Sequence, residues 1–392
     1  MDSPIESNIW KYYVFLICQF IFIAAPIIVL FFQDNGLTLY EIMILEAIFA
    51  ISIVVLEVPT GYFADIYGRK LSMIMGAFVG TMSMILLGVG TGFAVFLIAE
   101  IMGAAAKSLV SGADSAFLYD SLKNMKREKE YKKIKGNALF LLMMSFAVAN
   151  IIGGYLGSID LRMAVLASVP FNIVAIVIAY FMKEPKVKKK IFKRGHMHEI
   201  IKAGKFAFMK SRIRWLMLLT GIIQCFLIVI FWFYQPLLDY MGIGIVWFGF
   251  IYAGMNIVSA ISSKLSHNVE KMLGEKRSLI GIMVAMALGL FMMASVDSLL
   301  IVFLSFVIVQ AVRGFQQPVI DHYLNKMIPS DRRATILSIG QMSGRIMFAV
   351  FSPFIGWYAD VFTFQQALLL SAGTVTISFA ILMFFMYRDK VL

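Results

Sequence analysis

The chain has 392 residues, of which 60% are hydrophobic and only 15% are charged, and its mean hydropathy is +0.85. Soluble domains carry charge on about a quarter of their residues, so this composition excludes an ordinary soluble protein and indicates a polytopic membrane protein. The formal net charge of +12 at pH 7 is better explained by membrane topology and contact with anionic lipid headgroups than by nucleic-acid binding.

Apolar stretches near or above the ~20 residues that cross a bilayer recur about twelve times along the chain. We expect them at residues 12–32, 40–60, 71–90, 93–118, 137–157, 161–182, 214–236, 246–266, 279–296, 299–321, 334–357 and 365–387. The segment before the first stretch is mixed polar, and that stretch is long enough to span, so no cleavable secretory signal is evident. The sequence therefore predicts an all-α integral membrane protein with twelve transmembrane helices.

A short polar turn, GYFADIYGRK at residues 61–70, separates the second span from the third. Gly68 permits a tight turn, Asp65 places a carboxylate inside it, and Arg69 and Lys70 put two cations where the next span begins. The pattern G-x-x-x-D-x-x-G-R-K at this position resembles the signature loop of the major facilitator superfamily.

That resemblance implies a fold of two six-helix halves that rock about a central cavity. It also implies a gating role for the turn, in which Asp65 meets the positive N-terminal end of a helix from the other half. The gating set that we predict is Asp65, Gly68, Arg69, Lys70 and Glu57, the last of these near the cytoplasmic end of span two.

The distribution of cations predicts the orientation. If the N-terminus is cytoplasmic, residues 123–135 and 183–214 both face the cytoplasm, with seven and twelve Lys/Arg respectively, whereas the alternate loops hold only Arg162. This asymmetry follows the positive-inside rule. We therefore expect a multi-pass protein of the inner (cytoplasmic) membrane with both termini in the cytoplasm.

The longest polar stretch divides the chain in two. We predict an N-terminal six-helix bundle at residues 1–182, a basic cytoplasmic linker at 183–213 and a C-terminal six-helix bundle at 214–392. Weak repeats support the division. The turn HNVEKMLGEKRS at residues 267–278 falls after span eight, as GYFADIYGRK falls after span two.

Spans five and eleven also correspond. ANIIGGYLG at residues 149–157 and SPFIGWYAD at 352–360 both place small residues or a proline where helices must pack or bend closely. The first segment resembles the G-P-x-x-G-G motif of drug and proton antiporters within the superfamily, with Ala149-Asn150 in place of Gly-Pro.

The sequence contains no nucleotide-binding or enzyme motif. No Walker sequence, no G-x-G-x-x-G after a strand and no zinc-type His/Cys spacing occurs, and Cys18 and Cys225 lie inside spans. The 27 methionines and the segment His196-Met197-His198 suggest copper, but methionine packs readily in apolar interiors and the histidines lie in the linker. We expect no cofactor and no metal, and a chain driven by an ion gradient or by the substrate's own gradient.

Ionisable residues inside spans normally face a cavity or a partner, because burying a charge in the bilayer is costly. In span four, Glu100, Lys107 and Asp114 recur every seven residues, which predicts one helical face shared with Gly103 and Ser111.

In span ten, a second face is formed by Gln310, Arg313, Gln317 and Asp321. Lys107 and Arg313 each lie roughly 21 Å from the outer end of their span, near or somewhat past mid-membrane. The resemblance places helices one, four, seven and ten around the cavity, so both stripes are expected to face it.

Two interpretations of these cations remain open. In the first, the cavity binds an anionic substrate through Lys107, Arg313, Gln310, Gln317, Gln19 and Gln224. In the second, Glu100, Asp114 or Asp321 neutralises each cation within its own half. Candidates for carrying a coupled proton are Glu46, Glu100 and Asp114.

The function that we predict is secondary active transport by a monomer, with proton-coupled export of a small amphipathic or anionic molecule. A carboxylate-rich metabolite, a siderophore-like compound or a drug fits this prediction. An importer of an organic anion or nutrient on the same fold is the alternative. A membrane receptor or scaffold would need large soluble loops or a signalling domain, which this sequence lacks.

Overall fold

The computed structural model describes residues 5–185, 196–295, 298–329 and 332–391, and every regular element within these ranges is helical. Nine helices in the described ranges are long and apolar enough to cross a membrane. The predicted all-α membrane fold is therefore confirmed. Part of the predicted linker, residues 186–195, lies outside the described residues, and so do the side chains of His196-Met197-His198.

The chain forms two compact units, described here separately. Unit 1 contains residues 1–37, 48–191 and 244–253, and unit 2 contains residues 38–47, 192–243 and 254–392. Two helices are therefore divided: their first turns belong to one unit and the rest of each helix belongs to the other. These helices are α3 (Leu39–Tyr67) and α12 (Ile245–Met293).

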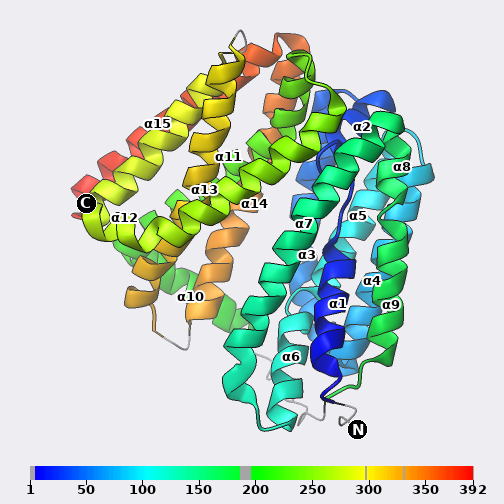
Figure 1. Ribbon diagram of the computed structural model, residues 1–392. Coiled ribbons are helices and arrows are strands. Elements are labelled where there is room, and N and C mark those ends of the chain that lie inside the picture. Colours follow the sequence, from blue (N-terminus) through cyan, green and yellow to red (C-terminus); the bar gives the residue numbers. More distant parts are fainter. Residues whose placement is uncertain (1–4, 186–195, 296–297, 330–331, 392) are drawn as a thin grey trace. The chain divides into compact units, whose positions relative to one another are not determined.

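Unit 1 contains most of α3 and a set of helices that run alongside one another (Figure 1). They are α1 (Asn8–Phe20), α2 (Ile28–Asp34), α4 (Arg69–Val89), α5 (Phe93–Val110), α6 (Ala113–Asn124), the short 3₁₀ helix η1 (Glu128–Glu130), α7 (Tyr131–Ile159), α8 (Leu161–Leu166) and α9 (Val169–Phe181). Small residues set the closest approach: a Cβ on Gly76 of α4 would lie 3.0 Å from the carbonyl oxygen of Ala106 on α5.

Three predicted spans of unit 1 are each built from two helices. The first is α1 and α2, the fourth is α5 and α6, and the sixth is α8 and α9. The prediction that Glu100, Lys107 and Asp114 share one helical face is therefore wrong. Helix α5 ends at Val110, Gly112 has φ +78°, and Asp114 lies in the first turn of a new helix.

Unit 2 contains most of α12 and a second set of helices. They are α10 (His196–Met209), α11 (Ser211–Tyr240), α13 (Leu299–Met327), α14 (Arg333–Val361) and α15 (Phe364–Arg388). Of these, α11, α13, α14 and α15 each have 25 or more residues. Helix α12 has two arms, residues 245–273 and 275–293, because Gly274 adopts the non-helical φ of +74° between them. These arms correspond to predicted spans eight and nine.

The small residues of spans five and eleven lie at close contacts, as predicted. In unit 1, a Cβ on Gly154 of α7 would lie 2.8 Å from the backbone nitrogen of Gly249 on α12. In unit 2, a Cβ on Gly356 of α14 would lie 2.8 Å from the carbonyl oxygen of Leu39 on α3. At both places two backbones approach so closely that only glycine fits.

Candidate functional site

Unit 2 carries a connected polar stripe on α13. The Nε2 of Gln317 donates to Oδ2 of Asp321 over 2.9 Å, and its Oε1 lies 3.5 Å from Nε2 of Gln224 on α11. Two turns before Gln317, Gln310 is buried and its Oε1 lies 3.4 Å from Nη1 of Arg313. The structure therefore brings together four of the six residues predicted to bind substrate.

Arg313 is the exposed member of this stripe. Within the described residues, the long contact to Gln310 is the only hydrogen bond of its guanidinium, and no carboxylate forms an ion pair with it. The acid on its own helix face, Asp321, is already bonded to Gln317. A guanidinium has five N–H donors, so most of those of Arg313 remain available to an anion.

In unit 1, Lys107 occupies the last turn of α5, where its charge is favourable against the helix dipole. Its Nζ lies 5.8 Å from the ring centroid of Phe49 on α3, which is a cation–π contact. Glu100 lies two turns earlier on α5 and is partly buried.

Gln19 of α1 is packed against other helices of unit 1. A Cβ on Gly80 of α4 would lie 3.4 Å from Nε2 of Gln19 and 3.7 Å from Oδ1 of Asn172 on α9. The Oε1 of Gln19 is buried and has no hydrogen-bond partner in the described part of the chain.

Asp114 has a partner that the sequence reasoning did not foresee. The Nζ of Lys135 on α7 donates to Oδ2 of Asp114 over 3.0 Å, to the hydroxyl of Tyr12 over 2.8 Å and to that of Ser115 over 2.8 Å. Three acceptors match the three donors of the ammonium group. Gly112 redirects the chain before α6, and Lys135 on α7 is a counter-ion of Asp114.

Glu46 and Glu57, two of the acids of α3, differ in burial. Glu46 is only 6% exposed, whereas Glu57 is partly exposed near Pro59. A buried carboxylate in a transmembrane helix marks a functional position by default, so Glu46 stays a candidate for coupling.

The predicted gating turn is organised by two further acids of unit 1. Arg69 forms ion pairs with two carboxylates: its Nη2 lies 3.6 Å from Oδ1 of Asp65, and its Nε lies 2.8 Å from Oδ2 of Asp120 on α6. The carboxylate of Glu184 accepts from the backbone nitrogens of Arg69 and Lys70 over 2.9 and 2.8 Å and thus caps α4. Sequence reasoning missed Asp120 and Glu184, although both are acids that closely follow predicted spans.

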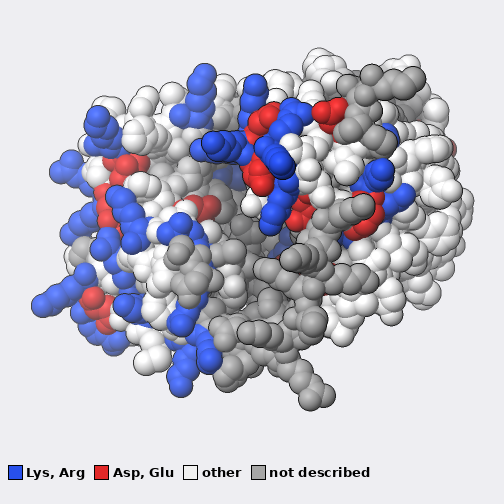
Figure 2. All heavy atoms as spheres, turned by 90° about the horizontal axis from the view of Figure 1, so that it is seen from below, with Lys and Arg blue, Asp and Glu red and all other residues white. Residues whose placement is uncertain are grey.

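The turn predicted at residues 61–70 is reduced to Gly68, because α3 continues to Tyr67 and α4 begins at Arg69. The repeat turn in unit 2 has a similar glycine conformation. Gly68 has φ +109° and ψ +150°, and Gly274 has φ +74° and ψ +170°. In both turns two adjacent cations follow the glycine, Arg69-Lys70 directly and Lys276-Arg277 after Glu275. Figure 2 shows many Lys and Arg side chains on the face seen from below.

A third acid caps the opposite end of α3, within unit 2. Oδ1 of Asp360 on α14 accepts from the backbone nitrogen of Leu39 over 3.1 Å, and Oδ2 accepts from that of Tyr40 over 2.7 Å. Thr38 and Glu41 complete a capping box at the same helix start. Asp360 ends the motif SPFIGWYAD, whose small residues were the signal that pointed to this contact.

The sequence profile of the Major Facilitator Superfamily matches residues 13–272 and 269–391, which is nearly the whole chain. The chain belongs to the major facilitator superfamily. Its relatives within this superfamily include the uncharacterized MFS-type transporter YxaM of Bacillus subtilis, which is 23% identical over 350 residues, or 85% of this chain and 86% of the relative. The quinolone resistance protein NorA of Staphylococcus aureus is 24% identical over 174 residues, or 44% of each chain.

Solved structures of transporters share the superfamily fold. The nucleoside transporter NupG superposes with a TM-score of 0.79 at 12% identity, covering 98% of this chain and 99% of that one. A D-xylose-proton symporter superposes with a TM-score of 0.75 at 14% identity, covering 98% and 97%. At these identities the likeness establishes the fold and leaves the substrate open.

Proposed function

We propose that this secondary transporter exports a small amphipathic or anionic molecule in exchange for protons. The observation that carries the proposal is the exposed Arg313 guanidinium on the polar stripe of α13, whose N–H donors are mostly unused by the described residues. A cation without a counter-ion is costly within a membrane. An anionic substrate group offsets that cost when it binds.

The neighbours of Arg313 fit a ligand with polar edges. Gln310 and Gln317 flank it one turn away on either side, and Gln224 extends the stripe to α11. Amide groups donate and accept, so they suit carbonyl, hydroxyl and amine groups. A forked guanidinium beside amides favours a carboxylate over a lipophilic cation.

Proton coupling is assigned to the acids of α3 and α5. Asp114 already has Lys135 as its counter-ion, so Glu46 and Glu100 are the better candidates. Glu46 is the first choice because its carboxylate is nearly inaccessible. The absence of a nucleotide-binding motif from the sequence supports a gradient as the energy source.

The membrane orientation follows from charge. Placing both termini in the cytoplasm puts the stretches at residues 123–135 and 183–214 on the same side as the turn at residues 61–70. The transporter then acts as a monomer in the cytoplasmic membrane, with lipid and a small molecule as its partners. Asp65, Arg69 and their neighbours form the gate on the cytoplasmic side.

The second candidate is import of an organic anion or nutrient. The polar stripe of α13 binds such a ligand equally well, and the symporter among the solved structures has the same fold. The similarity to NorA over 174 residues supports export instead.

Everted vesicles separate the two directions. A quinolone carboxylate is a suitable first probe, because NorA is a quinolone resistance protein. We expect a proton gradient, acidic inside, to drive uptake of the probe into everted vesicles without ATP, and Arg313→Ala to abolish it. Uptake that survives collapse of both the pH difference and the membrane potential contradicts proton coupling. Uptake into right-side-out vesicles along an inward proton gradient would favour the importer.

A further inference from the structure

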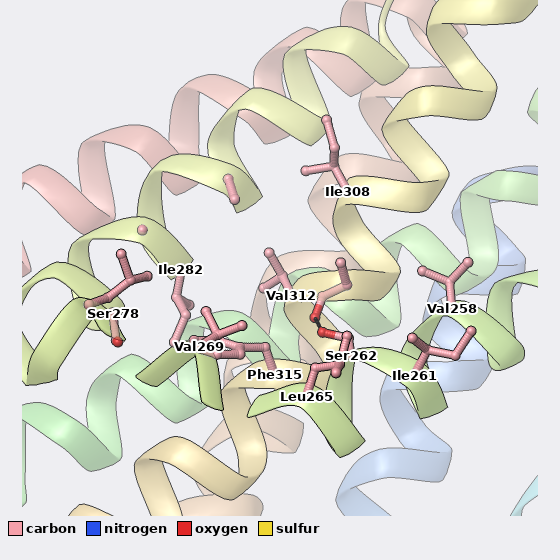
Figure 3. Close-up of a pocket in the computed structure, with 14 residues that line it drawn as sticks. Val258, Ile261, Ser262, Leu265, Val269, Ser278, Ile282, Ile308, Val312 and Phe315 are labelled. Atoms are coloured by element: carbon pink, nitrogen blue, oxygen red, sulfur yellow. Dashed lines mark hydrogen bonds between the residues drawn. The ribbon is translucent and has the colours of Figure 1, made fainter. Parts of the chain in front are cut away.

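Unit 2 contains an apolar groove of about 620 Å³ between the two arms of α12 and helix α13. Figure 3 shows side chains of all three segments around it. Its volume falls within the range of about 300–1,000 Å³ that is typical of small-molecule sites. Ser262 and Ser278 are its only polar side chains, and Ser262 already donates to the carbonyl oxygen of Ala311 over 2.6 Å.

The groove lies on the back of α13, away from the polar stripe. Ile308, Val312 and Phe315 line it at spacings of four and three residues. Gln310 and Arg313 are offset from Ile308 and from Phe315 by two residues, which is about 200° around a helix. The groove is therefore separate from the site proposed for transport, and some of its lining residues, such as Ile261 and Leu265, are exposed.

One end of the groove carries an unsatisfied polar group. Ser278 is 1% exposed, lines the groove, and its Oγ has no hydrogen-bond partner in the described part of the chain. A buried hydroxyl without a partner costs free energy. It lies in the first turn of the second arm of α12, directly after Lys276 and Arg277, which are both exposed.

The matching helix start in unit 1 has its own anion. There, after Gly68, the carboxylate of Glu184 accepts from the first two backbone nitrogens of α4. In unit 2, after Gly274, Glu275 pairs with Arg212, and no described carboxylate caps the second arm. Asp389, the acid at the corresponding end of α15, is instead bonded to Arg214 and to the indole of Trp215, which lowers its pKa.

We propose that this groove binds one anionic phospholipid, with an acyl chain between the arms of α12 and α13 and the phosphate at the start of the second arm. Arg277 and the backbone nitrogens of the first turn hold the phosphate, where the helix dipole favours an anion. The hydroxyl of Ser278 donates to the headgroup or ester oxygens. The lipid thus supplies the negative charge that Glu184 supplies in unit 1.

The test is native mass spectrometry of the delipidated full chain with phosphatidylglycerol and phosphatidylcholine of identical acyl chains. We expect one phosphatidylglycerol to be retained in preference to phosphatidylcholine. Gly281 lines the groove, and a Cβ there meets no atom within 4 Å, so Gly281→Leu places an apolar side chain in the groove and should abolish retention of both lipids. Gly373→Leu on α15 is the matched control, because Gly373 has equally open space and lies outside the groove.

A separate substitution at Arg277 tests the proposed contact with the phosphate. Arg277→Gln should lower the preference for phosphatidylglycerol by about tenfold, the effect of one charged hydrogen bond, while retention of phosphatidylcholine stays unchanged. Equal retention of the two lipids by the parent, unchanged retention in Gly281→Leu, or displacement of the lipid by millimolar inorganic phosphate would each overturn the proposal. So would a Gly281→Leu variant that keeps its lipid but loses transport of the quinolone, because the groove would then hold the substrate.

Discussion

Three spans of unit 1 are interrupted, whereas their counterparts by order in unit 2, α11, α13 and α15, run without a break. Proline alone does not explain the difference, because Pro236 and Pro318 lie inside the continuous helices α11 and α13. At two of the interruptions of unit 1, hydroxyl groups satisfy backbone groups that the helix ends leave free.

Those hydroxyl groups come from neighbouring helices. The backbone nitrogen of Ile23, between α1 and α2, donates to Oγ of Ser168 over 3.0 Å. At the end of α5, the carbonyl oxygen of Ser108 accepts from Thr60 over 3.0 Å, and that of Leu109 accepts from Ser72 over 2.6 Å. Irregular backbone survives at membrane depth only where protein groups replace water in this way.

The comparison extends to the charges. In unit 1, the buried carboxylate of Asp114 forms an ion pair with Lys135. In unit 2, no carboxylate of the described residues forms an ion pair with Arg313. Unit 1 therefore carries a neutralised internal network, and unit 2 carries the more available cation. Each of the following experiments acts on one side of this contrast.

The largest effect is expected from Lys135→Met in unit 1. Removing the ammonium leaves Asp114 as a buried charge without a counter-ion, which should lower the free energy of unfolding by about 3–5 kcal/mol. Thermal unfolding in detergent measures the change. Lys133→Met, at an exposed position on the same helix, should have little effect, and the double variant with Asp114→Asn should recover part of the loss. Parental stability of Lys135→Met would show that the pair contributes nothing.

The next effect is on ligand binding in unit 2. Arg313→Ala should weaken binding of an anionic substrate by about thirtyfold or more, the effect of losing a charged hydrogen bond worth roughly 2–5 kcal/mol. Arg313→Lys restores the charge but not the two-pronged geometry, so it should recover only part of the affinity.

Lys107→Ala is the matching change in unit 1. We expect it to weaken the same ligand less than Arg313→Ala does, because Lys107 is also in contact with the ring of Phe49. Titration calorimetry of each variant with the ligand measures the two losses of affinity and so ranks them. If the identified substrate proves to be a lipophilic cation, or if Arg313→Ala binds as tightly as the parent, then Glu100 and Asp114 replace the cations as the leading contacts.

A smaller effect is expected at the first interruption of unit 1. A Cβ on Gly153 of α7 would overlap the carbonyl oxygen of Ile23, so Gly153→Ala should destabilise the protein by about 1–3 kcal/mol. Gly136→Ala on the same helix is the control, because a Cβ there meets no atom within 4 Å. That control should be neutral or stabilising, since alanine favours a helix. Equal melting temperatures of the two variants would mean that the interruption tolerates movement of α7.

The smallest effect on stability is expected from Asp65→Asn. The carboxylate is 41% exposed and 3.6 Å from Arg69, and such surface pairs contribute about 0–1 kcal/mol. Turnover should fall more than stability, because we propose that this charge holds the cytoplasmic gate. The rate at which cysteines introduced on the cytoplasmic side are labelled measures how open the gate is. Normal transport and unchanged labelling in Asp65→Asn would show that the loop has no gating role.

The sequence by itself determined the class of fold. Twelve apolar stretches, each near the thickness of a bilayer, leave helices as the available structure, because backbone groups must be satisfied within the segment. The polar face of span ten was also readable, because α13 is one regular helix and its spacing of three and four residues is preserved.

Only the tertiary structure decided the partners of the charges in unit 1. The seven-residue spacing of Glu100, Lys107 and Asp114 assumes a continuous helix, and Gly112 with φ +78° breaks it. The interruption is stable because hydroxyl groups far away in the sequence satisfy its carbonyl oxygens. Local periodicity carries no information about such contacts, so the pairing of Asp114 with Lys135 and the capping of α4 by Glu184 emerge only when the helices pack.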